Sequence, residues 1–258
     1  MLPALDDGAP DLATALAMAR IAVADGITTT ACTPHIYAGL YENNGPAIQC
    51  AVKAFREQLE KEAISLQVTY GADVHLASDL LTGLRSEAIP SLHGSRYFLL
   101  EPPHHVAPPH LEEAVFKLVA AGYVPVITHP ERLTWIHDHY ALFTRLVKSG
   151  AWLQVTAGSL TGRFGPAARY WGERLLDEGL VHILATDAHG TKRRAPLLAE
   201  GRRVAERWVG AGEAKHLVKT RPHGILSNLN PDQLPALPDP RETRGILPRL
   251  LKRMFRRG

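Results

Sequence analysis

Five histidine or acidic residues each stand at the end of a short apolar run, and this repeated placement constrains the fold more than any other feature of the chain. The runs are rich in β-branched and large aliphatic residues, as buried strands are. Segments with a helical spacing of apolar residues separate them, which is typical of parallel strands joined by crossover helices. The carboxyl ends of parallel strands in a barrel converge on one face, so the five side chains are expected to lie together. These residues are His35, Asp73, Glu101, His129 and Asp187.

The same alternation gives the expected elements of an α/β fold. Strands are predicted at 28–33, 66–74, 96–100, 124–128, 152–155 and 182–186. Helices are predicted at 9–26, 45–63, 111–122, 140–150, 167–179 and 196–209. Prolines become dense after Val209, which predicts the end of the barrel there and the start of an extended tail.

Composition and charge exclude several classes of protein. The chain has 258 residues, of which 45% are hydrophobic and 21% charged, as expected of a soluble globular protein. Its net charge is +3, but residues 241–258 alone hold seven arginines and lysines, so the body is nearly neutral and no nucleic-acid partner is expected. With only two cysteines, no apolar run of about 18 residues and no basic, apolar leader, the chain is predicted to be cytoplasmic.

The strongest local element places Asp187 and His189 two residues apart at a strand end. A carboxylate and an imidazole at this spacing can serve adjacent metal ions, and such donors suit Mn, Fe or Zn. An aspartate that caps the next helix beside a surface histidine is the structural alternative. Together with the other strand-end residues, the pair favours a metal centre.

The motifs follow one another in an order that resembles the PHP-type protein-tyrosine phosphatases of bacterial capsule and exopolysaccharide loci (the CpsB/YwqE type). The resemblance implies a distorted (β/α)7 TIM-like PHP barrel. It also implies up to three divalent metals, manganese above all. The motifs are Leu-Pro-Ala-Leu-Asp-Asp-Gly at 2–8, Thr-Pro-His at 33–35, Gly-Ala-Asp-Val at 71–74, Leu-Glu at 100–101, Thr-His-Pro-Glu-Arg at 128–132, Ala-Gly-Ser-Leu-Thr-Gly at 157–162 and Ala-Thr-Asp-Ala-His at 185–189.

The resemblance also implies a role for each residue. One ion would be held by Asp7, His35 and His189, and the middle ion by Asp73, Glu101 and His129. The last ion would use Asp73 as a bridge, Asp187, and a His-x-His pair from a first strand. Arg132 and Arg194 would contact the substrate phosphate, since a guanidinium fork suits phosphate oxygens. The implied substrate is phosphotyrosine in the C-terminal tail of a bacterial tyrosine kinase that controls polysaccharide export.

Two departures from the family pattern stand out. The His-x-His pair would precede Met1, so the first strand is expected to be missing or incomplete, and either a start codon further upstream or an N-terminal truncation is expected. Asp73 stands where the family has glutamate, and one methylene less shortens the reach of the side chain by about 1.5 Å. The chain is therefore expected to keep at most two well-furnished metal sites.

The chain is divided into a metallophosphatase domain at 1–230 and a Pro-rich, then basic, tail at 231–258. Apolar residues alternate with arginines at 245–257, which would suit peripheral contact with an anionic membrane. A solvated tail is the simpler interpretation, and we favour it.

Other interpretations of function stay open or are set aside. Cys50 and Arg56 have the spacing of a cysteine phosphatase, but the residues between them are helix formers rather than a phosphate-cradling loop. The alternatives to a phosphotyrosine phosphatase are a phosphatase for a small metabolite such as histidinol phosphate, and a catalytically degenerate binding protein. A further group of histidines is expected on loop surfaces, with a place at the substrate rim as the alternative for two of them, His104 and His105. This group comprises His93, His104, His105, His110 and His137.

Overall fold

The computed structural model describes residues 1–77 and 79–239. The expected basic segment at 241–258, and with it the membrane contact, lies outside the described residues. Among the helices that are described, none is both long enough and apolar enough to cross a bilayer.

Every strand pairing among these residues is parallel, which confirms the α/β fold. A two-stranded sheet joins β1 (Thr29–Cys32) to β3 (Gln67–Tyr70). A six-stranded sheet has the order β2 (His35–Ile36), β4 (Asp73–His75), β5 (Tyr97–Glu101), β6 (Val124–Thr128), β7 (Trp152–Thr156) and β8 (Ile183–Ala185). Within the described chain β8 and β1 do not pair, so hydrogen bonds do not close the expected seven-unit ring there.

The first predicted strand, 28–33, ends before Pro34 as expected and a further short strand follows it, whereas the second predicted strand, 66–74, is divided in two. Thr33 and Pro34 separate β1 from β2, and Gly71 and Ala72 separate β3 from β4. Proline has no N–H to give to a ladder, although its carbonyl accepts from Asp73 at 3.1 Å. Gly71 packs closely at its position, where a Cβ would lie 2.7 Å from the end of the Leu92 side chain. The interruptions turn β2 and β4 so that they join the larger sheet.

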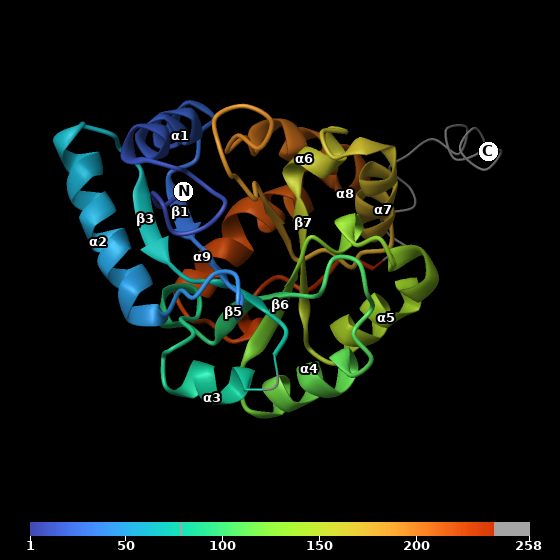
Figure 1. Cartoon of the computed structure of the whole chain (residues 1–258). Helices are drawn as coiled ribbons and strands as arrows, with labels where there is room; N and C mark the ends of the chain where they lie inside the picture. The colour runs from blue at the N-terminus through green and yellow to red at the C-terminus, as the bar shows by residue number, and fades with distance from the viewer. Residues whose placement is uncertain (78, 240–258) are drawn as a thin grey trace.

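Helices cover the outside of the strands (Figure 1). Asp11 and Asn44 cap the first two helices by accepting the backbone N–H of Thr14 and Ala47. Three short helices, α3, α6 and α9, were not expected from the sequence. The helices are α1 (Leu12–Ala24), α2 (Gly45–Lys61), α3 (Leu80–Arg85), α4 (Leu111–Ala120), α5 (Ile136–Lys148), α6 (Ala157–Leu160), α7 (Gly165–Asp177), α8 (Ala199–Lys215) and α9 (Arg221–Leu226).

The extended tail expected after Val209 is wrong, because the chain stays helical far beyond that residue. Gly210, with φ 80° and ψ 164°, kinks α8 directly after Val209, but a further helical stretch runs to Lys215, a π-helical turn follows at His216–Thr220, and α9 ends only at Leu226. Pro222 lies inside this helical run, directly after the π-helical turn. The rise in proline density therefore did not mark a loss of structure.

The segment after residue 230 is held to the body by one buried arginine. Arg221 is fully buried and donates to both carboxylate oxygens of Glu213, at 2.6 and 3.2 Å. It also donates to the carbonyls of Pro235 and Ala236, at 3.1 and 3.0 Å. Leu234 is buried against Gly224, where a Cβ would lie 2.3 Å from it. The first part of the predicted tail thus packs on the domain, and the boundary at 230 stays a prediction.

Replacing Arg221 by methionine should destabilise the protein strongly. The change leaves the largely buried Glu213 carboxylate unpaired, which costs about 3–5 kcal/mol when one partner of such a pair is removed. Urea unfolding followed by circular dichroism measures the loss. Arg202→Met is the matched control, because Arg202 is about half exposed and pairs with Glu206 on the helix surface. Equal losses in the two variants would contradict the assignment.

Candidate metal centre

The candidate site begins with the alternation of side chains along the strands. Tyr97 and Leu99 of β5 belong to an inner apolar cluster, whereas Phe98 and Leu100 pack in the main core with the helices. Side chains two residues apart share one face of a strand, so Glu101 continues the inner face at the strand end. By the same rule, Thr128 shares the inner face of β6 with Val124 and Val126. Gln154 and Thr156 share that of β7 with Trp152, and Ala185 and Asp187 continue that of Ile183 in β8. The inner face is thus apolar in the middle and polar at the carboxyl end.

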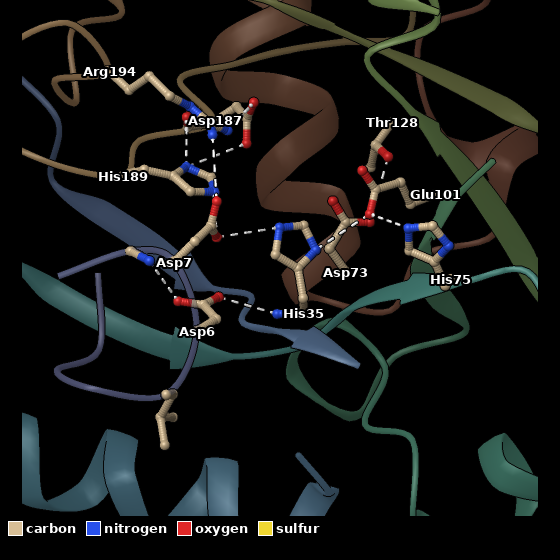
Figure 2. A network of polar contacts seen from close by, with 12 residues as sticks. Asp6, Asp7, His35, Asp73, His75, Glu101, Thr128, Asp187, His189 and Arg194 are labelled. Atoms are coloured by element: carbon tan, nitrogen blue, oxygen red, sulfur yellow. Dashed lines mark hydrogen bonds and ion pairs between the residues drawn. The ribbon is translucent and has the colours of Figure 1, made fainter. Parts of the chain in front are cut away.

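All seven predicted metal ligands lie at this end of the sheet, on several different segments, and Figure 2 shows those other than His129. Asp7 comes from the N-terminal loop, which Asp6 fastens by accepting the N–H groups of Gly8 and His35, at 2.9 and 3.1 Å. The remaining ligands come from β2, β4, β5 and the turns after β6 and β8. The predicted ligands are Asp7, His35, Asp73, Glu101, His129, Asp187 and His189.

One group of three matches the set expected for a single ion. Asp7 Oδ1 lies 3.2 Å from His189 Nε2 and 3.7 Å from His35 Nε2. One ligand atom of each residue lies within 4.8 Å of the others. Ligand atoms about 2.1 Å from a common ion are separated by distances of this order. The geometry therefore suits a divalent cation, although ligation itself stays a prediction.

The second group differs from the expected middle site. Its three members within 4.8 Å are His35, Asp73 and Glu101, whereas the resemblance implied His129 in place of His35. His129 Nε2 instead approaches the other oxygen of Glu101, at 3.2 Å. His35 lies between both groups, with Nε2 towards Asp7 and Nδ1 3.3 Å from Glu101 Oε2. Sequence order could not assign His35 to two groups at once.

The ligand set expected for the last ion is not formed among the residues the structure describes. Asp187 Oδ2 is instead paired with both predicted phosphate-binding arginines, Arg132 and, at 2.8 Å, Arg194. No group of three metal-binding side chains within the described ranges contains Asp187. Its carboxylate therefore holds the two guanidinium groups at the edge of the site.

Mutual proximity shifts the pKa values of the clustered groups. Burial and the neighbouring Glu101 charge raise the pKa of Asp73 to about 7. Burial opposes protonation of His35, but contact with Glu101 and the charge of Asp73 raise its pKa to about 9. Burial would raise the pKa of Glu101, yet His129, His35 and His75 hold it well below its usual range. Contact with His189 lowers the pKa of Asp7 to about 2.

Backbone strain and unpaired nitrogens mark the same place. His129 and Asp187 have φ values of 35° and 49°, in the left-handed region that costs non-glycine residues about 1–3 kcal/mol. The buried Nδ1 atom of His129 has no hydrogen-bond partner, whereas Nδ1 of His35 faces Glu101 Oε2 at 3.3 Å. An imidazole nitrogen left unpaired beside carboxylates is suited to bind a metal ion, so the donor set fits the metals that the sequence implied.

Sequence reasoning missed His75 and Glu131. His75 Nε2 lies 3.1 Å from Glu101 Oε2, and its position two residues after Asp73 on the same strand was the available signal. Glu131 is buried and accepts from the Thr156 N–H and the Ser159 hydroxyl, so it anchors the turn that carries Arg132. Nothing in the spacing of the residues separated Glu131 from an ordinary surface glutamate.

The structure shows where Cys50 and the loop histidines lie relative to the site. Cys50 lies exposed on helix α2, and Arg56 donates from that helix to the carbonyl of Val68, so no cysteine phosphate loop exists there. The ring of His104 lies 5.8 Å from that of His129, and burial lowers the pKa of His104 to about 4. The rim alternative therefore fits His104, whereas His93, His105, His110 and His137 are exposed.

Fold and site together define a class: a parallel α/β protein whose strand ends carry an imidazole–carboxylate cluster of the metal-binding type, bordered by two arginines. The family described as capsular polysaccharide synthesis, CpsB/CapC, matches residues 1–227. The chain belongs to this family.

Known relatives agree with the assignment. The chain is 36% identical over 228 residues to the tyrosine-protein phosphatase YwqE of Bacillus subtilis, covering 88% of this chain and 89% of YwqE. It is 26% identical over 227 residues to the tyrosine-protein phosphatase CpsB of Streptococcus pneumoniae, covering 86% and 93%. A solved chain from work on YwqE and CpsB, described there as unique metal-dependent tyrosine phosphatases, matches with a TM-score of 0.85 at 36% identity, over 89% of this chain and 92% of that one.

Metal affinity should rise with pH. A cation that binds this cluster has to displace the protons that His35 keeps up to about pH 9 and Asp73 up to about pH 7. Displacement of one proton makes the affinity about tenfold higher for each pH unit. Calorimetric titration of the chelator-treated protein with Mn²⁺ between about pH 6 and about pH 8, in buffers of different ionisation enthalpy, measures both affinity and proton release. An affinity independent of pH would contradict this charge arrangement.

Proposed function

We propose that the chain is a divalent-metal-dependent phosphomonoester hydrolase that acts on phosphotyrosine in a protein. The observation that carries the proposal is the convergence of Arg132 and Arg194 beside the imidazole–carboxylate cluster. The two arginines can bind the phosphate, and the imidazole–carboxylate cluster can hold metal ions next to it. The relatives named tyrosine-protein phosphatases support the choice of phosphotyrosine.

The metal-binding residues fall into two groups with one shared member. Asp7, His35 and His189 would hold one ion, while Asp73 and Glu101, with His35 or His129, would hold another. Asp187 would bind a third metal ion if further ligands were supplied. Mixed carboxylate and imidazole donors suit manganese, with iron and zinc as alternatives. Divalent cations at such a site supply Lewis acidity and lower the pKa of water for attack on phosphorus.

The arginines would bind and orient the phosphate. The guanidinium of Arg132 lies over the Phe164 ring, 4.4 Å from its centroid, which fixes the plane of the fork. Arg194 has a buried Nε without a hydrogen-bond partner, so a donor is available for an anion. Asp187 competes for both groups, and a phosphate dianion that replaces it as their acceptor would meet an already aligned pair.

The proposed substrate is the phosphotyrosine tail of a bacterial tyrosine kinase in capsule or exopolysaccharide synthesis. Support comes from the capsular polysaccharide description of the family. Phenolate is a good leaving group, since its conjugate acid has a pKa near 10, about that of tyrosine. We also propose that the protein is cytoplasmic. Its two cysteines form no disulfide, as is usual in a reducing compartment, and the proposed kinase tail would lie in the same compartment.

Conservative replacement of either arginine should lower hydrolysis of a phosphotyrosine peptide. Arg132→Lys and Arg194→Lys keep the charge but lose the fork, and removal of one such donor lowers kcat about 10²–10³-fold. Initial rates with added Mn²⁺ measure the effect. Cys50→Ser is the matched control and should leave the rate unchanged, because Cys50 lies outside the site.

The same assay separates the competing functions. Faster hydrolysis of histidinol phosphate than of phosphotyrosine peptides would replace the proposal by a metabolite phosphatase. Binding of phosphopeptide without turnover, with every candidate metal tried, would indicate a binding protein. A rate abolished by Cys50→Ser but not by chelators would exclude the metal mechanism altogether.

A further inference from the structure

His75 lies beside the metal centre although neither the motifs nor the expected ligand sets include it. It is the last residue of β4 and pairs directly, in the register of the sheet, with Glu101 at the end of β5. Asp73, two residues earlier on the same strand, projects from the same face. The position of His75 is therefore fixed by the backbone of two adjacent strands rather than by a loop.

The contact with Glu101 is close and largely shielded from water. His75 Nε2 lies 3.1 Å from Glu101 Oε2, and the two side chains are 19% and 10% exposed. A carboxylate can only accept, so the imidazole nitrogen is the donor of the pair. His35 Nδ1 approaches the same oxygen at 3.3 Å (Figure 2). His129 Nε2 lies 3.2 Å from the other oxygen. Glu101 is thus in contact with three histidines.

A tyrosine supports the imidazole by packing on the face of its ring. The ring of Tyr37 stacks on that of His75, with centroids 3.8 Å apart and planes 6° from parallel. The backbone N–H of Tyr37 donates to the carbonyl of Tyr41, so the tyrosine itself belongs to a defined turn. The stack removes rotational freedom from His75 before any ligand binds.

We propose that His75 is a positioning residue of the metal centre, which fixes the Glu101 carboxylate in the orientation that binds the cation. The inference rests on the metal centre of the proposed function. Carboxylate ligands are held by hydrogen bonds from neighbouring groups, and loss of such a partner weakens metal binding about 10–100-fold. His75 does not join either group of three ligand atoms, which separates its role from direct ligation.

Metal binding without substrate tests the inference. Chelator-treated protein is titrated with Mn²⁺ and Co²⁺, and dissociation constants are measured by competition with a fluorescent chelator. His75→Leu should bind about 10–100-fold more weakly. His75→Gln carries an amide N–H near the place of Nε2 and should recover most of the affinity. His137→Leu is the control, since that side chain is 80% exposed and contacts Asp138.

The outcomes are distinct. Unchanged affinity in His75→Leu overturns the inference, and an equal loss in His75→Gln also overturns it, in favour of direct ligation by the imidazole. Should His75→Leu fail to fold, Tyr37→Ala against Tyr37→Phe carries the test, because only alanine removes the stack and should weaken binding. Wild-type metal affinity in Tyr37→Ala then overturns the inference. Hydrolysis is measured separately: weak metal binding in His75→Leu together with an inactive wild type refutes the phosphatase proposal alone.

Discussion

The site depends on the contacts between the Glu101 carboxylate and the three imidazoles that surround it. His35, His75 and His129 reach it from β2, β4 and the turn after β6, at 3.1–3.3 Å. A carboxylate buried to this degree would be costly without positive or donor partners. The histidines offset that cost, and, against the opposing effect of burial, contact with Glu101 in turn raises the pKa values of His35 and His129. The strands are thereby held together at their carboxyl ends by charge as well as by backbone ladders.

The placement of Glu101 follows from the two-residue period of the strand. Tyr97 and Leu99 fill the inner face beneath it, so the apolar core and the polar cluster are successive parts of one surface. This continuity explains why strand ends could be recognised in the sequence. An apolar run that ends in histidine or a carboxylate is a local pattern, and parallel strands convert five such patterns into one cluster.

What the sequence could not predict depends on turns and on side-chain partners. The division of the predicted strand 66–74 at Gly71 depends on packing against the Leu92 side chain, which comes from a later segment. The helical stretch after Gly210 was not expected, because Pro222 lies inside it. His75 lies one residue beyond the Gly-Ala-Asp-Val motif, although the two-residue period of the strand places it on the same face as Asp73. The sharing of His35 by two ligand groups appears only in three dimensions.

Asp73 determines how the cluster changes between its proton-bound and metal-bound forms. It is buried, accepts from Thr128 at 3.4 Å and has a pKa raised towards 7 by burial and by Glu101. Two adjacent carboxylates cannot both stay ionised cheaply in a shielded site, so one tends to hold a proton. A divalent cation removes that conflict because it compensates both charges. The short side chain of Asp73 limits its reach, and His35, which pairs with it in the strand register, lies with Asp73 and Glu101 in one group of candidate ligands.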